Sequence, residues 1–438
     1  MRKSRGDDPS GVAAVLDGMR NGRFTALDYA RRCIARVHDH EAAVRAFVAL
    51  DEHRALGIAA ACDESGSGPL RGLPVGVKDI FDTSDLPTGC GSPIYEGRRP
   101  NRNAGVVELL LKAGAYVFGK TVTTEFAHMH PGMTRNPWNP AHTPGGSSSG
   151  SAAAVAAGFV PAAIGSQTNG SVIRPAAFCG VVGFKPTVGL IPFSGGLHFA
   201  KTLDHVGVMA RSVDDAGLVS ATLLGGELEG WETAQAAAPR IGFLASVPWQ
   251  VPLEDGAAGL RKAIERLRGA GASIRDFLLP ENCAQANIVH RTIMLFEGAR
   301  RHSETQSAHR VLMSDTLNAD LDAGRTITPH FYRDALERRS GIAARARDWF
   351  DNFDVIVCLP APGAAPARLD ITGDPSYCTL WSLTGFPAIT IPTGLSPAGL
   401  PFGMQLAAAP GQDAALLRVA RWCETVMQFS AMPPLGRD

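Results

Sequence analysis

A segment rich in glycine and serine stands before a run of small apolar residues and could hold a nucleophilic centre. The segment reads Thr143-Pro-Gly-Gly-Ser-Ser-Ser-Gly-Ser151, and the run that follows spans residues 152–158. A helix made almost wholly of Ala and Val has no polar face, so we expect it to be buried and the preceding loop to be held in place. The alternative interpretation is a flexible Gly/Ser linker.

Residues 165–175 carry a second candidate group, the hydroxyl of Ser171. The segment reads Gly-Ser-Gln-Thr-Asn-Gly-Ser-Val-Ile-Arg-Pro and follows an apolar run. Asn169 and Gly170 can adopt positive φ, and successive amides in such a turn converge on an anion. A serine directly after this turn would place its hydroxyl beside a bound oxyanion, which is the geometry of a nucleophile. An ordinary turn is the alternative.

A base is needed to activate such a serine, and Lys78 is a candidate. It lies in the apolar stretch Leu-Pro-Val-Gly-Val-Lys-Asp-Ile-Phe of residues 73–81. Burial there would lower the lysine pKa toward neutrality, so that the amine could accept a proton. The alternative is a solvated lysine at the end of a strand.

An α/β fold must position these three segments, because helical and strand-like patterns alternate along the chain. With 438 residues, 45% of them hydrophobic, the protein can bury a large core. We see no internal repeat and no long linker, so residues 1–438 are interpreted as a single domain. Helices are expected at 12–19, 25–37, 106–113, 152–158, 212–224, 257–268, 329–350 and 413–427, and strands at 115–118, 241–245, 355–359, 388–392 and 404–407.

Composition excludes several classes of function. Lys plus Arg equals Asp plus Glu at 42 each, so the chain has no electrostatic footprint for nucleic acid or an anionic membrane. The polar first ten residues do not resemble a signal peptide, and no run is long enough to span a bilayer. The eight cysteines form no C-x-x-C pair, which favours a reducing cytoplasm. His128 and His130 lack an acidic third ligand, so no metal is expected.

Together these segments resemble the amidase signature family of serine amidohydrolases, and the resemblance runs over nearly the whole chain. It implies the fold of that family, a mixed central β-sheet covered by α-helices on both faces. The matching motifs are Gly68-Pro-Leu-Arg-Gly-Leu-Pro-Val-Gly-Val-Lys-Asp79, Ala113-Gly-Ala115, Gly119-Lys-Thr121, Pro144-Gly-Gly-Ser-Ser148, Gly183-Phe-Lys-Pro-Thr187, Gly385-Phe-Pro-Ala388 and Gly399-Leu-Pro-Phe-Gly-Met-Gln405.

The resemblance implies a catalytic triad of Ser171, Ser147 and Lys78, in which the peptide bond before Ser147 is cis. Neutral Lys78 would accept a proton from Ser147, which accepts one from the attacking Ser171. The amides of Thr168, Asn169, Gly170 and Ser171 would hold the oxyanion. The implied substrate pocket includes Ala127, His128, Met129, Gly145 and Gly146.

The sequence departs from the common family pattern behind the proposed nucleophile. Gln167 stands where an Asp is usual, and Ile173 stands where an Arg is usual, with Arg174 displaced by one position. In the common pattern the Asp and Arg can form a pair. We infer that both charges were lost together, because a single buried charge would cost several kcal/mol. Asn169, where Gly or Ala is usual, narrows the expected oxyanion turn.

The resemblance implies an amidohydrolase that cleaves the C–N bond of a small or aryl amide without a cofactor. A close variant would act on carbamates or esters, since their carbonyl groups offer the same electrophile. A rival class is the glutaminase subunit of a tRNA-dependent amidotransferase, which usually keeps the Asp that is Gln167 here. A binding protein without activity is a third reading. The expected partner is a small-molecule substrate, and the sequence does not decide between a monomer and a homodimer.

Overall fold

The computed structural model describes residues 10–225, 228–233 and 237–435. Helices and strands alternate along these residues, as the sequence predicts. The α-helices are α1 (Val12–Arg20), α2 (Ala26–Val44), α3 (Glu52–Ser65), α4 (Gly105–Lys112), α5 (Ser149–Ala156), α6 (Ile173–Cys179), α7 (Val213–Leu224), α8 (Glu254–Gly269), α9 (Ala286–Arg301), α10 (Ser303–His309), α11 (Asp315–Thr326), α12 (Pro329–Arg347), α13 (Thr379–Thr384) and α14 (Asp413–Met427). The strands are β1 (Phe47–Leu50), β2 (Pro74–Lys78), β3 (Tyr116–Thr121), β4 (Ala162–Gln167), β5 (Val182–Lys185), β6 (His205–Ala210), β7 (Arg240–Phe243), β8 (Ser273–Asp276), β9 (Val355–Cys358), β10 (Ala388–Leu395) and β11 (Pro401–Ala407).

These strands form one mixed sheet of eleven strands in the order β1-β3-β2-β4-β6-β5-β10-β11-β9-β7-β8. Strand β2 runs parallel to β3 and β4, and β7 runs parallel to β8 and β9. The strands between them pair antiparallel. Segments far apart in the chain are therefore neighbours in the sheet, as where β2 pairs with β4.

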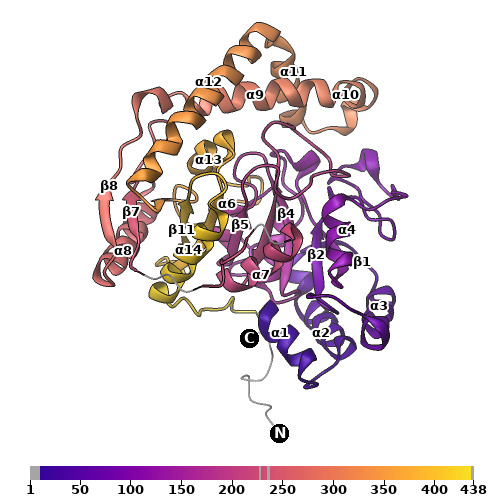
Figure 1. Ribbon diagram of the computed structural model, residues 1–438. Coiled ribbons are helices and arrows are strands. Elements are labelled where there is room, and N and C mark those ends of the chain that lie inside the picture. Colours follow the sequence, from indigo (N-terminus) through magenta and orange to yellow (C-terminus); the bar gives the residue numbers. More distant parts are fainter. Residues whose placement is uncertain (1–9, 226–227, 234–236, 436–438) are drawn as a thin grey trace.

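Helices cover both faces of this sheet (Figure 1). One group, α5 and α6, packs against β4, β5 and neighbouring strands, while α7, α8 and α14 pack on β6, β10 and β11. Helix α5 is buried along its whole length, as its lack of a polar face predicts. The predicted helix caps are confirmed as well, because the side chains of Thr25 and Ser212 accept hydrogen bonds from the backbone amides of Asp28 and Asp215.

Residues 290–329 contain most of three helices that are not among those expected from the sequence. They are helical over most of their length and form parts of α9, α10 and α11, which lie together at the top of Figure 1, where α9 packs against the other two. The buried positions of α9 include Val289, Ile293 and Phe296, which recur at helical spacing. That periodicity was readable in the sequence and predicts the helix.

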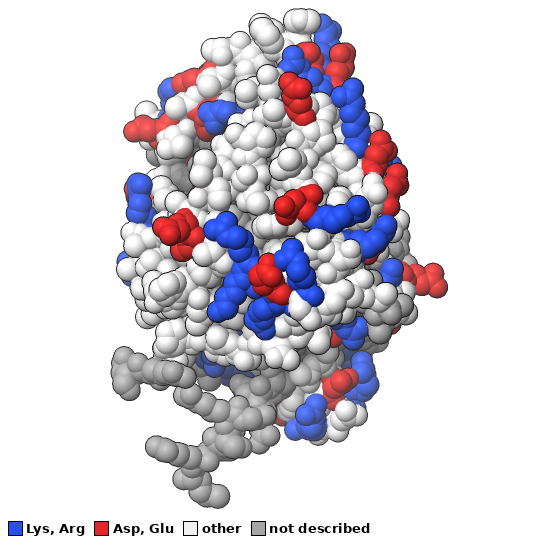
Figure 2. Space-filling model, turned by 90° about the vertical axis from the view of Figure 1, so that its left-hand side faces the viewer, with Lys and Arg blue, Asp and Glu red and all other residues white. Residues whose placement is uncertain are grey.

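Basic and acidic side chains are interspersed on the face that Figure 2 shows, with uncharged surface between them. This distribution agrees with the equal counts of the two signs in the sequence. Among the residues the structure describes, no helix is both long and apolar enough to cross a membrane.

Candidate active site

Lys78 is the last residue of β2, and its side chain is fully enclosed. The Nζ atom lies 2.7 Å from Ser147 Oγ and 2.8 Å from Ser166 Oγ. Burial lowers the pKa of Lys78 well below its usual value, and the carboxylate of Asp204 opposes part of that shift. Burial therefore shifts the equilibrium toward the neutral amine, which is the form that can accept a proton. Sequence reasoning did not identify Ser166, although it belongs to the polar segment 165–175.

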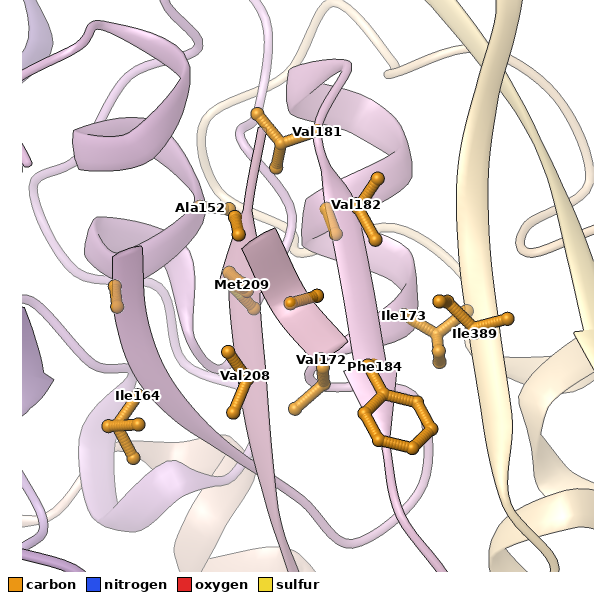
Figure 3. Close-up of a cluster of buried hydrophobic side chains, with 14 of the residues drawn as sticks. Ala152, Ile164, Val172, Ile173, Val181, Val182, Phe184, Val208, Met209 and Ile389 are labelled. Atoms are coloured by element: carbon orange, nitrogen blue, oxygen red, sulfur yellow. The ribbon is translucent and has the colours of Figure 1, made fainter. Parts of the chain in front are cut away.

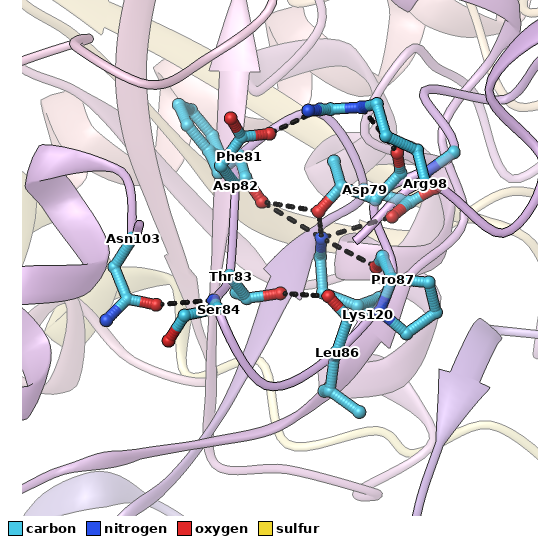
Figure 4. Close-up of polar contacts among 12 residues, drawn as sticks. Asp79, Phe81, Asp82, Thr83, Ser84, Leu86, Pro87, Arg98, Asn103 and Lys120 are labelled. Atoms are coloured by element: carbon cyan, nitrogen blue, oxygen red, sulfur yellow. Dashed lines mark hydrogen bonds and ion pairs between the residues drawn. The ribbon is translucent and has the colours of Figure 1, made fainter. Parts of the chain in front are cut away.

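A buried ion pair anchors the backbone next to Lys78. The carboxylate Oδ1 of Asp79 lies 3.1 Å from Nζ of Lys120 on β3, and the ammonium also donates to Thr88 Oγ1 at 2.6 Å. Figure 4 shows these contacts converging on Lys120. Because β2 and β3 also pair along their length, this network fixes the end of the strand from which Lys78 projects.

The backbone around Ser147 is held by contacts from two other segments, one at Thr124 and one at residues 171–174. The Gly146–Ser147 peptide bond is cis. The Gly146 carbonyl accepts a hydrogen bond from Arg174 Nη2 at 2.7 Å, and the Ser147 carbonyl accepts one from the Thr124 amide at 3.2 Å. The amide after Ser147 donates to the carbonyl of Ser171 at 3.3 Å. This contact joins the two candidate segments, and both serines are buried.

Within the turn formed by residues 168–171, the carbonyl groups of residues 168, 169 and 170 each accept a hydrogen bond from a residue outside the turn. In a trans peptide the N–H points away from the C=O, so the following amides face the opposite side. Within the described part of the chain, no acceptor is recorded for the amides of residues 169–171. They are thus free to bind an anion. The carbonyl contacts are Thr168 O with His290 Nε2 at 3.0 Å, Asn169 O with Ser382 Oγ, and Gly170 O with the Arg174 amide at 2.9 Å.

The expected positive φ in this turn is wrong, because neither Asn169 nor Gly170 adopts it. The carbonyl partners on α9 and α13 shape the turn without a left-handed residue. Glycine at position 170 avoids tight contacts instead, since a Cβ there would lie 3.1 Å from Pro375 Cβ and 3.2 Å from Cys378 Sγ.

Gln167 connects the turn to helix α6 through both ends of its amide. Its Oε1 accepts the amides of Val172 at 2.8 Å and Ile173 at 3.0 Å, and these belong to the first turn of α6. Its Nε2 donates to Ser382 Oγ at 3.0 Å, and that hydroxyl donates in turn to the Asn169 carbonyl. A neutral side chain thus caps the helix and supports the turn at once.

The side chains of Ile173 and Arg174 leave α6 in different directions. Ile173 lies beside Phe184 of β5 and Ile389 of β10 in the buried cluster of Figure 3. Arg174 is 2% exposed and donates to Gly146 and to Thr372 Oγ1 at 3.1 Å. Burial lowers the pKa of Arg174 to about 10. The displaced arginine therefore contacts the Ser147 loop instead of a carboxylate at position 167.

The residues expected in the substrate pocket lie around the same loop. Ala127 has a φ of 57° and is buried, whereas Met129 is 37% exposed. The His128 ring stacks on Phe199, and its Nε2 lies 3.2 Å from Asp320 on α11. His128 thus has a packing partner and a carboxylate partner. Within the described ranges, no three His, Cys, Asp or Glu side chains are grouped as metal ligands would be.

The two predicted pocket glycines are both required by close packing. Gly145 has a φ of +82°, and a Cβ there would lie 2.7 Å from the Cα of Pro175. A Cβ on Gly146 would lie 2.7 Å from Thr372 Cγ2. The structure therefore explains these glycines through the neighbouring segments 172–175 and 371–375.

Comparison with known proteins gives a consistent result. The pattern of the Amidase family matches residues 28–417. The A-subunit of the glutamyl-tRNA(Gln) amidotransferase of Chloroflexus aggregans is 33% identical over 481 aligned residues, with 97% of each chain covered. A crystal structure described as that of an amidase is 29% identical, has a TM-score of 0.83 and covers 95% of this chain and 100% of its own. The peptide amidase of Stenotrophomonas maltophilia is 28% identical, with a TM-score of 0.83 and coverage of 97% and 98%.

The chain therefore belongs to the amidase family, and its mixed sheet covered by helices is the amidase signature fold. It is a hydrolase of that family, acting on carbon–nitrogen bonds.

Proposed function

We propose that the protein is an amidohydrolase that cleaves the C–N bond of a small or aryl amide through an acyl-enzyme on Ser171. The observation that best supports this proposal is the enclosed Lys78 amine, which lies 2.7 Å from Ser147 Oγ and has a strongly lowered pKa. Neutral Lys78 takes a proton from Ser147 as Ser147 takes one from Ser171. The Ser171 oxygen then bonds to the substrate carbonyl carbon.

The remaining steps follow from charge and proton balance. The carbonyl oxygen becomes an oxyanion, and the amides of residues 168–171 are the donors that stabilise it. The proton held on the Ser147–Lys78 pair passes to the leaving nitrogen as the C–N bond breaks. Water then attacks the ester by the same relay and regenerates Ser171. No step requires a cofactor, and a carbamate carbonyl would follow the same course.

Labelling with a fluorophosphonate probe tests the nucleophile directly. We expect the probe to modify Ser171 and Ser171→Ala to lose both labelling and amide turnover. Ser149→Ala is the matched control, because this buried serine of the same motif donates only to the Val122 carbonyl at 3.3 Å. Labelling that persists in folded Ser171→Ala would assign the nucleophile to another residue.

A second candidate is the glutaminase subunit of a tRNA-dependent amidotransferase. Its support is the 33% identity to amidotransferase chains of that kind over 97% of both chains. Against it stands Gln167, where that subunit usually has an Asp. Purification from native cells decides between the two, with the mass of the complex also reporting a monomer or homodimer. Hydrolysis of amides by the isolated chain supports the first candidate, and activity only with copurified subunits supports the second.

A further inference from the structure

Asp204 is a buried carboxylate that has no role in the steps proposed above. It directly precedes β6, and its side chain is 2% exposed. Its Oδ1 accepts a hydrogen bond from Thr168 Oγ1 at 2.6 Å, and its Oδ2 accepts the backbone amides of Phe199 at 3.0 Å and Ala200 at 3.1 Å. Burial raises the pKa of Asp204, whereas these donors favour the ionised carboxylate and oppose that rise.

The negative charge of Asp204 has no permanent cation beside it. In the described part of the chain, no Lys or Arg side chain lies within ion-pair distance of this carboxylate. The basic group in contact with it is His198, whose Nδ1 lies 2.9 Å from Oδ2 and which is charged only when protonated. Hydrogen bonds therefore hold this charge in place, and a positive charge that forms nearby would be stabilised by it.

The ends of β4 and β6 bring Asp204 close to Lys78. The two strands pair antiparallel as far as the last residue of β4, so the next residue, Thr168, comes opposite Asp204. On the other side of β4, Lys78 Nζ contacts Ser166 Oγ at 2.8 Å. Ser166 and Thr168 are two residues apart, a span of at most about 7 Å. This placement agrees with the effect of Asp204 on Lys78, whose pKa it raises against the larger effect of burial.

Other titratable groups around the turn carry no charge near pH 7 or are already paired. Burial lowers the pKa of His290, which contacts the Thr168 carbonyl, to about 4. The pKa of His205, at the start of β6, is lowered well below its usual value for the same reason. Asp79, which follows Lys78, is paired with Lys120. Asp204 is thus the charged group best placed to act on Lys78.

We propose that Asp204 is a positioning residue, which holds Thr168 at the start of the oxyanion turn and stabilises the positive charge that Lys78 gains in the relay. The inference rests on the amidase function proposed above, because the charge arises when Ser171 attacks and its proton is replaced on Ser147 as Lys78 takes one. Lys78 is then an ammonium ion until a proton passes to the leaving nitrogen. Asp204 itself exchanges no proton in these steps.

Asp204→Asn removes the charge and keeps the shape. Its amide oxygen can accept the two backbone amides, and its nitrogen can donate to Thr168 Oγ1. We expect the acidic limb of the pH profile of kcat/KM, and of the rate of fluorophosphonate labelling, to move about one pH unit lower, because loss of the negative charge lowers the pKa of Lys78. The plateau should fall about threefold or more, since a weaker base takes the proton less readily. A merely structural residue would lower the plateau without moving the limb.

Asp413→Asn is the matched control. Asp413 is also buried, accepts the Thr187 hydroxyl at 2.5 Å and the Thr187 amide at 2.8 Å, and acts on the buried Lys185. It should keep the wild-type limb. Thr168→Val removes the hydroxyl but leaves the carboxylate, so its limb should also stay in place. An unmoved limb in His198→Gln would exclude the imidazole as the titrating group.

An unmoved limb in folded Asp204→Asn would overturn the proposal, as would an equal shift in Thr168→Val or Asp413→Asn, or loss of the limb in His198→Gln. Asp204→Ser, which leaves room for water, gives the same measurement where the Asn variant does not fold. Failure of both variants to fold would make Asp204 structural. A failure of the amidase function itself would appear separately, as wild-type protein without amide turnover and without fluorophosphonate labelling.

Discussion

Replacing Ser382 with alanine tests whether the turn beside Ser171 is held by side chains of distant helices. The Ser382 hydroxyl is fully buried, accepts from Gln167 Nε2 at 3.0 Å and donates to the Asn169 carbonyl. Its removal leaves the buried Gln167 amide and the partly buried Asn169 carbonyl without this partner, and an unpaired buried polar group costs about 1–3 kcal/mol. We therefore expect the free energy of unfolding to fall by about 2 kcal/mol or more.

The effect on catalysis should be separate from the effect on stability. The Asn169 carbonyl and the Gly170 amide share one peptide plane, so releasing the carbonyl lets that amide turn away from the oxyanion. Complete loss of one such donor costs about 2.7–4 kcal/mol, and a partly misoriented donor should cost about tenfold in kcat. KM should change little, because the oxyanion forms only in the transition state.

Urea unfolding and steady-state kinetics on the same preparations measure the two effects. Thr384→Val is the matched control, because Thr384 donates to the Leu380 carbonyl within the same helix, away from the turn. The control should keep the wild-type kcat. A stable Ser382→Ala protein with unchanged kcat would refute the claim that Ser382 orients the turn, and the contact would then be structural only.

The remaining predictions concern buried charge. Activity should rise with pH through the lowered pKa of Lys78, because only the neutral amine accepts a proton. Lys78→Ala should slow the hydrolysis of amides more than that of activated esters, whose leaving groups need less protonation. Equal losses of activity on both substrates would make Lys78 structural. In the wild type, the free energy of unfolding should rise with pH between about 7, the folded pKa of Lys185, and its usual value of 10.5, because the unfolded chain holds a proton there that the folded chain has lost. Lys185→Met should abolish this rise and keep the pH profile of activity. Urea titrations at several pH values measure the difference. Ile173→Arg should lower the free energy of unfolding by about 3–5 kcal/mol, because it buries an unpaired charge. Gln167→Asp should lower it less, because two amides at the start of α6 face position 167, and the double variant should recover part of the loss. Additive changes in the free energy of unfolding would show that the two positions do not couple.

Much of the fold could be predicted because local patterns and tertiary packing agree. The Thr25 cap, the buried Ala-rich helix α5 and the bounds of α14 all follow from short-range sequence features. Helix α9 is not among the helices expected from the sequence, although Val289 and Ile293 carry its period. The polar His290 lies on its buried face, so the contrast between the two faces is weak in the sequence. Helix α10 has no comparable apolar stripe, since Gln306 is its buried residue.

The candidate site could be predicted only where one segment holds the whole signal. The Ser147 and Ser171 motifs are local, so their residues could be named from the sequence, and the structure brings their segments together. The partners that shape the turn, His290 and Ser382, come from α9 and α13, more than one hundred residues away in the sequence. No short motif marks such partners. The prediction of a positive φ at Asn169 or Gly170 was wrong for the same reason, because it explained the shape of the turn by local backbone conformation. Distant side chains shape the turn instead.

The departures at positions 167 and 173 have a common physical explanation in this chain. An aspartate at 167 could accept the α6 amides, but only an amide group can also donate to Ser382 and so support Asn169. Once position 167 is neutral, an arginine at 173 would have no counter-charge, and Ile173 instead fills the core between the helix and the sheet. The positive charge reappears one residue later at Arg174, where the helix turns it toward the Gly146 carbonyl. In place of the Asp–Arg pair of the common family pattern, this chain therefore has a neutral helix cap at Gln167 and a buried guanidinium that contacts the loop carrying Ser147.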